Sequence, residues 1–351
     1  MKRRQVIGRI AQAGALALVA PRAVFAKDAR SRYGAPALDA HAHLVSRELA
    51  GWIRSSSADP EMRLGIRPMN GRVVVDSLEQ DRIERAIVLS TASLHAADAG
   101  VVAVRRKKPA DERRDVRNEN DFTLAEAVEY APKLIPFCSV NPKRDYAIEE
   151  LRRCAARRMS GLTVHFGASD VRLRDPRHLA SVQALLAEAA RLDLPVIVHL
   201  FNDAIPDFGT EDVDILMAQV VEPLPSLRIS IAHLGGAGGA SEQGPLRIFA
   251  ALIHAARARP AVAKRVWADC SSVLLTEARP GAKPISAAQR TALGGMLQSW
   301  GLDRVMWGSD TMSDRHPTSL EQAQSTWPLS EADWNVLAAF NGAGFLRPSG
   351  S

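Results

Sequence analysis

Two histidines lie one residue apart in the segment LDAHAHLV, which spans residues 38–45. On a strand, side chains two residues apart share a face, whereas on a helix they lie about 200° apart around the axis. Only a strand therefore lets the imidazoles of His41 and His43 meet. The flanking residues predict such a strand with two faces: Leu38, Ala40, Ala42 and Leu44 on the apolar face, and Asp39, His41 and His43 on the polar face. A pair of hydrogen-bonded core histidines and a pair of metal ligands are both open interpretations here.

Three further polar side chains end short apolar runs elsewhere in the chain. His199 lies near the end of PVIVHLFN, His233 lies in ISIAHLGG, and Asp310 closes VMWGSD. Buried parallel strands otherwise favour Val, Ile and Leu, so polar groups at several carboxyl ends indicate a shared site. Imidazole and carboxylate groups suit zinc or another first-row divalent ion. This convergence favours metal ligation over core packing for His41 and His43.

Short apolar runs alternate with helical patterns along the chain. Eight runs are expected to be strands: 38–44, 85–90, 134–140, 161–166, 195–200, 228–234, 266–273 and 304–307. Helices are expected over 121–129, 146–158, 179–192, 245–257 and 287–300, and the third of these has a clear 3.6-residue apolar period. The alternation predicts an α/β fold, a (β/α)8 TIM barrel. An open doubly wound sheet is the alternative, but no Gly-rich dinucleotide loop follows the first strand.

Two polar stretches are expected to cap the mouth of this barrel. Residues 51–70 follow the first strand, and residues 91–120 follow the second. Both belong to the strand-to-helix side, where barrel enzymes place their chemistry.

Composition narrows the class of protein. The chain has 351 residues, 46% of them hydrophobic, and a net charge of +6, which suits a globular domain with a large core. Its basic clusters at 105–108 and 152–158 are flanked by acidic residues, so we expect solvated faces and no nucleic-acid partner. Cys138, Cys154 and Cys270 share no close spacing and are expected to be buried thiols.

The first 26 residues are predicted to be an export signal. A basic start precedes a short apolar segment, and VFA offers small residues for cleavage after Ala26. The apolar segment is too short to span a bilayer comfortably, so no stable membrane insertion is expected. RRQVIG resembles a twin-arginine signal, which implies the twin-arginine export machinery as a partner and a periplasmic location. Residues 27–351 would form the barrel. A homo-oligomer of this barrel is also an open interpretation.

The motifs DAHAH, PVIVHL, IAHLGG and MWGSD together resemble the amidohydrolase superfamily, specifically its amidohydrolase-2 branch of lactonases and metal-dependent decarboxylases. RNENDFTLAEAVEYAPKLIPFCSVNP and VLAAFNGAGFL extend the resemblance over nearly the whole mature chain. The resemblance implies a metal held by His41, His43, His199 and Asp310. It also implies that His233 lies beside the bound water or substrate, with His233 and Asp310 as the catalytic pair.

One departure from the binuclear relatives concerns the fourth strand. Those relatives carry a carboxylated lysine or a glutamate there, whereas GLTVHFGAS offers Thr163 and His165. We therefore expect one divalent ion, Zn²⁺ or alternatively Mn²⁺. His165 could touch the substrate or the metal, or could simply form hydrogen bonds at the mouth. The remaining histidines are expected on the surface or in loops: His95, His178, His254 and His316.

The expected activity is hydrolysis of a lactone, ester or amide bond in a small carboxylic-acid-like substrate by a metal-activated water. Asp310 would act as base and acid, and His233 would polarise the carbonyl group or stabilise the oxyanion. Arg144, Arg172 or Arg315 could bind a substrate carboxylate, with Arg144 the first choice. Non-oxidative decarboxylation of an unsaturated or aromatic acid is the alternative. A periplasmic metal-binding or solute-binding barrel without turnover is a third possibility.

Overall fold

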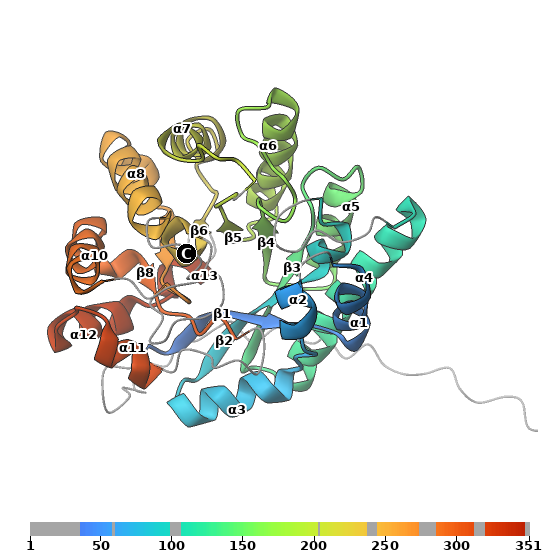
Figure 1. The fold of residues 1–351 in the computed structure, drawn as a ribbon, viewed down its shortest axis with the longest axis horizontal. Helices are drawn as coiled ribbons and strands as arrows, with labels where there is room; N and C mark the ends of the chain where they lie inside the picture. The colour runs from blue at the N-terminus through green and yellow to red at the C-terminus, as the bar shows by residue number, and fades with distance from the viewer. Residues whose placement is uncertain are drawn as a thin grey trace, which may run out of the picture. The chain divides into compact units, whose positions relative to one another are not determined.

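The structure is a computed structural model that describes residues 36–57, 60–98, 107–202, 204–236, 244–273, 286–311 and 320–347. Its strands are β1 (Leu38–Leu44), β2 (Arg85–Ser90), β3 (Leu134–Ser139), β4 (Gly161–His165), β5 (Val196–His199), β6 (Ile229–Ile231), β7 (Val266–Asp269) and β8 (Val305–Met306). All seven neighbouring pairs from β1–β2 to β7–β8 are parallel, so the strand order in the sheet is the order in the chain (Figure 1).

Backbone hydrogen bonds bring the last strand against the first. The amide of Ala40 donates to the carbonyl of Trp307 at 3.0 Å, and the amide of His43 donates to the carbonyl of Thr311 at 2.8 Å. The amide of Asp310 donates to the carbonyl of His41 at 2.7 Å. Eight parallel strands in a nearly closed ring, with helices between them, form the predicted (β/α)8 barrel.

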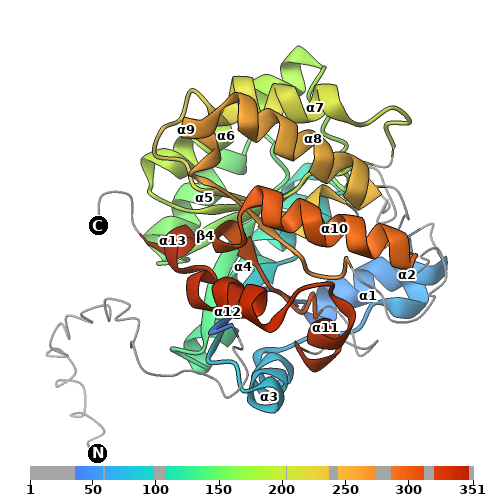
Figure 2. The ribbon, with the colours of Figure 1, turned by 90° about the vertical axis from the view of Figure 1, so that its left-hand side faces the viewer.

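Helices follow the strands and surround them, as Figures 1 and 2 show. They are α1 (Arg47–Ser56), α2 (Pro60–Gly65), α3 (Gly71–Asp81), α4 (Pro109–Glu129), α5 (Ala147–Ala156), α6 (Pro176–Arg191), α7 (Thr210–Ile215), α8 (Gly244–Ala258), α9 (Pro260–Ala263), α10 (Ala287–Trp300), α11 (Leu320–Thr326), α12 (Glu331–Phe340) and α13 (Ala343–Leu346). Short helical turns complete the set: η1 (Ala92–Ala96), η2 (Leu216–Val221), η3 (Ala232–Gly235) and η4 (Leu302–Arg304). None of the described helices combines the length and apolar character that a membrane crossing needs.

The second half of the polar stretch at residues 91–120, which is expected to cap the mouth, is helical. α4 begins at Pro109 and continues without a break to Glu129. Proline suits the first turn of a helix because its missing N–H would have no partner there. Residues 51–70 are also largely helical, since α1 and α2 lie within or beside them.

The strict alternation expected for β1 is wrong. The pairing of β1 with β2 shifts register between Asp39 and Ala42. As a result Leu38 and Ala40 pack in one apolar cluster with Phe345 of α13, whereas Ala42 and Leu44 pack in the larger cluster beneath the helices. The shift changes which apolar residues share a face. His41 lies within it and His43 follows it, and the two rings still point to the same side.

The interior of the barrel, away from the histidines, is filled by apolar side chains that include Phe345 of α13. Phe345 lies with its ring centre 6.2 Å from that of Phe137 and 5.7 Å from that of Trp267. Because these two partners come from β3 and β7, the α13 side chain packs between distant strands. Large apolar residues thus fill the amino ends of the strands, and polar side chains are left at the carboxyl ends.

Candidate metal centre

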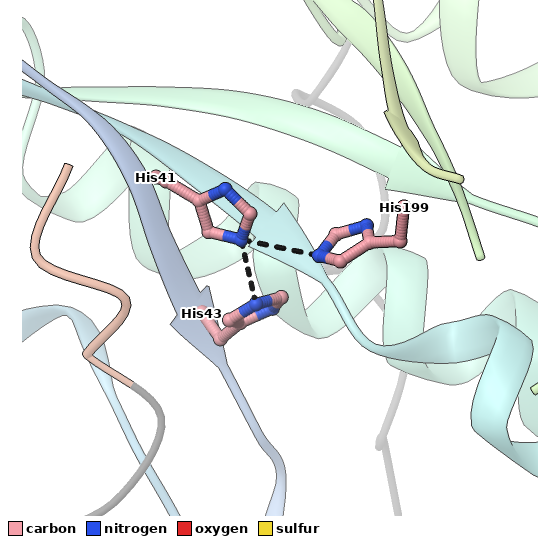
Figure 3. A group of neighbouring side chains, drawn as sticks. All are labelled: His41, His43 and His199. Atoms are coloured by element: carbon pink, nitrogen blue, oxygen red, sulfur yellow. Dashed lines mark hydrogen bonds between the residues drawn. The ribbon is translucent and has the colours of Figure 1, made fainter. Parts of the chain in front are cut away.

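Three imidazoles from opposite strands converge at the carboxyl ends of the barrel strands (Figure 3). Nε2 of His41 lies 3.1 Å from Nε2 of His43 and 3.2 Å from Nε2 of His199. All three side chains are buried, and their ligand atoms lie within 4.8 Å of one another. The structure therefore brings together the three histidines that the sequence predicted as ligands.

Asp310 adds a carboxylate to this group. Its Oδ1 lies 3.4 Å from Nε2 of His43 and 3.7 Å from Nε2 of His41. The backbone of Asp310 adopts a left-handed φ of 52°, which is uncommon for a residue with a side chain. The hydrogen bond from its N–H to the carbonyl of His41 stabilises that conformation. With its side chain 18% exposed, Asp310 lies at the boundary between the buried histidines and the mouth.

The spacing of the three nitrogens fits a shared cation better than hydrogen bonding. The Nδ1 of His41 lies 3.1 Å from Oδ2 of Asp269, so a neutral His41 keeps its proton on Nδ1 and a single lone pair on Nε2. One lone pair cannot accept hydrogen bonds from both His43 and His199. Nitrogen ligands that share one zinc-like ion at about 2.0–2.1 Å lie roughly 3.0–3.4 Å apart. Both separations from Nε2 of His41 fall in this range.

The charges around these imidazoles also suit a cation. Burial lowers the pKa of His41, but the carboxylates of Asp269, Asp310 and Asp39 outweigh it, and the net shift is upward. Burial would raise the pKa of Asp310, but His233, His43 and His41 hold it far below its usual range. Burial together with the neighbouring imidazoles lowers the pKa of His199 well below its usual value. Asp310 is therefore an ionised acceptor and His199 a neutral ligand at neutral pH.

His233 lies beside the cluster in η3, directly after β6. Its ring centre lies 4.8 Å from that of His41 and 5.1 Å from that of His199. Its Nδ1 lies 2.8 Å from the carbonyl oxygen of Ser271, which can only accept, so neutral His233 carries its proton on Nδ1. Its φ of 54° and that of Leu234, 52°, are both left-handed, which marks a strained turn at the site.

His165 ends β4 and pairs in register with His199 of β5. The two rings stack with centres 4.8 Å apart and planes 9° apart. The amide of Ala168 donates to Nδ1 of His165 at 3.0 Å, so the ring proton lies on Nε2. Burial and the nearby imidazoles lower the pKa of His165 to about 4, which keeps it neutral at neutral pH. Thr163, two residues earlier, is buried and supplies no carboxylate.

Asp269 is the site residue that the sequence analysis missed. It ends β7, is fully buried, and contacts His41 through Oδ2 and the amide of His233 through Oδ1. With His41 and His233 it forms a second group of possible ligands, but its oxygens face N–H and O–H donors. The available signal was its place at the end of the run VWAD, the same rule that identified His199.

The arginine expected to bind substrate lies in an internal ion-pair network. Arg144 donates to both oxygens of Asp98 at 2.9 Å, to Glu112 at 2.7 Å, and to the carbonyl of Ala96 at 2.9 Å. Arg172 pairs with Asp170 at 3.0 Å and is half exposed. Among the described residues, neither Arg144 nor Arg172 makes a hydrogen bond or ion pair with the histidine cluster. Arg315 lies outside the described residues.

The expectation that the other histidines are surface or loop residues is wrong for His95. It is buried in η1, where its Nδ1 lies 2.7 Å from Nζ of Lys107. His254 is exposed on α8, as expected, and His178 lies on α6 with its Nδ1 accepting from the amide of Arg172. His316 lies outside the described residues.

Comparison with known proteins gives the family. A family model described as amidohydrolase matches residues 38–346. The chain belongs to the amidohydrolase family. A sequence comparison with curated proteins finds no match.

Several solved structures share the fold of this amidohydrolase. The 5-carboxyvanillate decarboxylase of Sphingomonas paucimobilis matches with a TM-score of 0.59 and 14% identity, over 89% of this chain and 99% of that one. The 5-carboxyvanillate decarboxylase of Novosphingobium aromaticivorans, complexed with manganese and 4-hydroxy-3-methoxy-5-nitrobenzoic acid, matches with a TM-score of 0.60 and 15% identity. The match covers 90% of this chain and 97% of that one. An amidohydrolase of Burkholderia multivorans with bound zinc matches with a TM-score of 0.57 and 16% identity, over 89% of this chain and 99% of that one.

These likenesses agree with the barrel fold. In this amidohydrolase the three histidines come from β1 and β5, and Asp310 comes from the segment that follows β8. The amidohydrolase therefore has the barrel, the histidine cluster and the carboxylate that the sequence predicted.

Proposed function

We propose that this amidohydrolase is an enzyme that holds one divalent metal ion, zinc or manganese, and hydrolyses a lactone, ester or amide bond in a small carboxylic-acid-like substrate. His41, His43, His199 and Asp310 would hold the ion. The observation that carries the proposal is the approach of Nε2 of His43 and Nε2 of His199 to within 3.1 and 3.2 Å of Nε2 of His41. The Asp310 carboxylate lies beside these atoms. The absence of a carboxylate at Thr163 and His165 supports one ion rather than two.

The bound ion would supply Lewis acidity, polarising a carbonyl oxygen and making a nucleophilic water easier to deprotonate. Asp310 is the protein group suited to accept that proton, because its carboxylate lies beside the histidine nitrogens at the edge of the mouth. His165 would donate from Nε2 to the substrate oxygen on which charge develops. Neutral His233 keeps its proton toward Ser271, so its Nε2 can accept a proton, and donation to an oxyanion would require the imidazolium form.

Non-oxidative decarboxylation of an unsaturated or aromatic acid is the second candidate function. It is favoured by the fold likeness to two decarboxylases of an aromatic acid, whose identities of 14% and 15% are low. Both candidate substrates carry a carboxylate, and the donors of Arg144 are already engaged by Asp98 and Glu112, so Arg144 does not distinguish the two reactions. We place hydrolysis first because the site offers an ionised acceptor at the mouth.

Metal content and turnover test the proposal together. We expect about one zinc or manganese ion per chain, and roughly tenfold or greater loss of affinity when one ligand is removed in His41→Ala. His254→Ala, an exposed change on α8, is the matched control and should leave metal content unchanged. Hydrolysis of a panel of lactones and aryl esters supports the first candidate, and carbon dioxide release from aromatic acids supports the second. Full metal content in His41→Ala contradicts the ligand assignment, and zero turnover with every divalent ion favours a binding barrel.

We also propose that the protein is exported through the twin-arginine machinery and cleaved after Ala26. Residues 1–26 lie outside the described residues, so the proposal depends on the sequence pattern alone. Amino-terminal sequencing of protein recovered from the periplasm should begin at Lys27. A mature chain that still begins with residues 1–26 would contradict it.

A further inference from the structure

We infer that Asp269 is a positioning residue that determines which ring nitrogen of His41 faces the metal centre, and that the same carboxylate holds His233 in place. The inference rests on the proposed metal-dependent function. It concerns a residue for which the sequence analysis expected no role, at the end of β7 and outside the expected ligand set.

The contacts of Asp269 divide between its two oxygens. Oδ2 lies 3.1 Å from Nδ1 of His41. Oδ1 accepts from the amide of His233 at 3.1 Å, from the amide of Ser271 at 3.2 Å, and from the Ser271 hydroxyl. A fully buried carboxylate thus faces four donors, three of them on one oxygen.

This arrangement fixes the tautomer of His41. A carboxylate oxygen accepts, so neutral His41 must carry its proton on Nδ1, and its Nε2 lone pair then faces His43 and His199. His43 and His199 have no comparable support, because their buried Nδ1 atoms lack a hydrogen-bond partner among the described residues. Of the three converging imidazoles, His41 is the one that the protein orients before any ion binds.

The same carboxylate reaches the other side of the site. Its bond to the His233 amide holds a residue with a left-handed φ of 54°. The Ser271 hydroxyl, which donates to Asp269, also lies 3.0 Å from Nδ1 of His233, and the Ser271 carbonyl lies 2.8 Å from it. One carboxylate on β7 therefore positions a β1 imidazole directly and the His233 ring through Ser271.

Asparagine at position 269 tests this division because it has the same shape and only one acceptor. Its carbonyl oxygen would stay with the three donors of His233 and Ser271, so its NH2 group would face His41. Nδ1 of His41 would then have to accept, and the proton would move to Nε2. The lone pair that faces His43 and His199 would be lost, although the fold and every proposed ligand remain.

The experiment combines a tautomer measurement with a metal titration of the full chain. Long-range ¹H–¹⁵N spectra of metal-free, ¹⁵N-histidine-labelled protein, recorded in alkaline buffer where the imidazoles are neutral, report the tautomer of His41. His41→Gln assigns its signals. We expect the Nδ1–H form in the wild type and the Nε2–H form in Asp269→Asn. Zinc affinity, measured by competition with a chromogenic chelator, should fall roughly 10–100-fold in Asp269→Asn.

Ser271→Ala is the matched control. It removes one donor to Oδ1 but keeps the Asp269–His41 contact, so His41 should stay in the Nδ1–H form and zinc affinity should change less than about threefold. The inference is overturned if wild-type His41 is already in the Nε2–H form, a result that requires no variant to fold. It is also overturned if Asp269→Asn keeps both the Nδ1–H form and the wild-type affinity. Failure of the wild type to bind zinc or manganese would instead contradict the proposed function, whatever the tautomer.

Discussion

Hydrogen-bond direction separates two histidines of similar type and place. His165 and His233 both stand at the mouth beside the His199 ring. An amide donates to Nδ1 of His165, whereas a carbonyl accepts from Nδ1 of His233. Neutral His165 is therefore a donor through Nε2, and neutral His233 is an acceptor. The sequence offered the residue type at each strand end, but the tautomer depends on backbone groups that only the folded loops supply.

The first prediction concerns the donor role of His165. His165→Phe keeps an aromatic ring to stack on His199 but removes the N–H, so we expect kcat/KM to fall roughly 10²–10³-fold, as when one oxyanion donor is lost. Metal content should stay at the wild-type value, because Nε2 of His165 is not among the converging nitrogens. Steady-state kinetics and elemental analysis of the same preparation measure both quantities. Full activity in this variant would remove His165 from the mechanism.

At the scale of elements, Arg144 fastens three segments together at the mouth. Its guanidinium joins the loop after β3 to Asp98 near η1 and to Glu112 in the first turns of α4. Tyr146 adds a hydrogen bond of 2.8 Å to the same Glu112. The structure thus supports a role for Arg144 in positioning the loops that cover the mouth.

The second prediction separates that role from substrate binding. Arg144→Gln removes the cation that Asp98 and Glu112 share, but Asp98 keeps Lys143 at 3.2 Å and Glu112 keeps the Tyr146 hydroxyl. Loss of a charged partner in such a network costs about 1–3 kcal/mol. We expect a lower Tm, but an unchanged KM for the folded protein at a temperature well below the transition. A raised KM with an unchanged Tm would instead support direct substrate contact.

The pH dependence of this effect provides the control. Burial raises the pKa of Asp98, but Arg144 and Lys143 outweigh it and hold the pKa below 3.8. A carboxyl group whose pKa is lowered by folding stabilises the folded protein at pH values above its unfolded-state pKa. This stabilisation is lost as the pH falls through the folded-state pKa. In Arg144→Gln most of that depression disappears. The difference in Tm between wild type and variant should therefore shrink as the pH is lowered from 7 to about 3.

The elements themselves were largely readable from the sequence. All eight expected strands form within the predicted segments, and the first two strands and α10 have the predicted bounds, because apolar runs, helical periods and caps such as Ser286 are local signals. The register shift in β1, the start of α4 and the burial of His95 were not readable. Each depends on contacts between segments distant in sequence, as when Lys107 meets His95. The sequence could have identified Asp269 as a polar residue at a strand end, but not its contacts with His41 and His233.

At the scale of the whole molecule, the site depends on how the barrel closes. His41 and His43 lie at the start of the described barrel and Asp310 at its far end, 267 residues beyond His43. They meet because β8 and the residues after it pair with β1. Asp39 strengthens this seam, since it accepts from the amide of Ser309 at 2.9 Å and from the Ser309 hydroxyl. The same pairing that closes the barrel therefore also brings Asp310, the fourth proposed ligand, to the histidines.

The last prediction tests this link at Gly308, where the segment after β8 packs closely against His41 of β1. A Cβ at this position would lie 2.7 Å from Cβ of His41 and 3.0 Å from its backbone nitrogen, closer than neighbouring chains tolerate. Gly308→Ala should push β8 away from β1, lowering stability by about 1–3 kcal/mol and weakening metal binding at the same time. Gly295→Ala is the matched control, because a Cβ in this part of α10 meets nothing within 4 Å. It should stabilise the helix by about 0.5–1 kcal/mol and leave metal affinity unchanged. Denaturant unfolding and zinc titration measure both effects, and a Gly308→Ala protein with wild-type zinc affinity would show that Asp310 reaches the histidines without the closed seam.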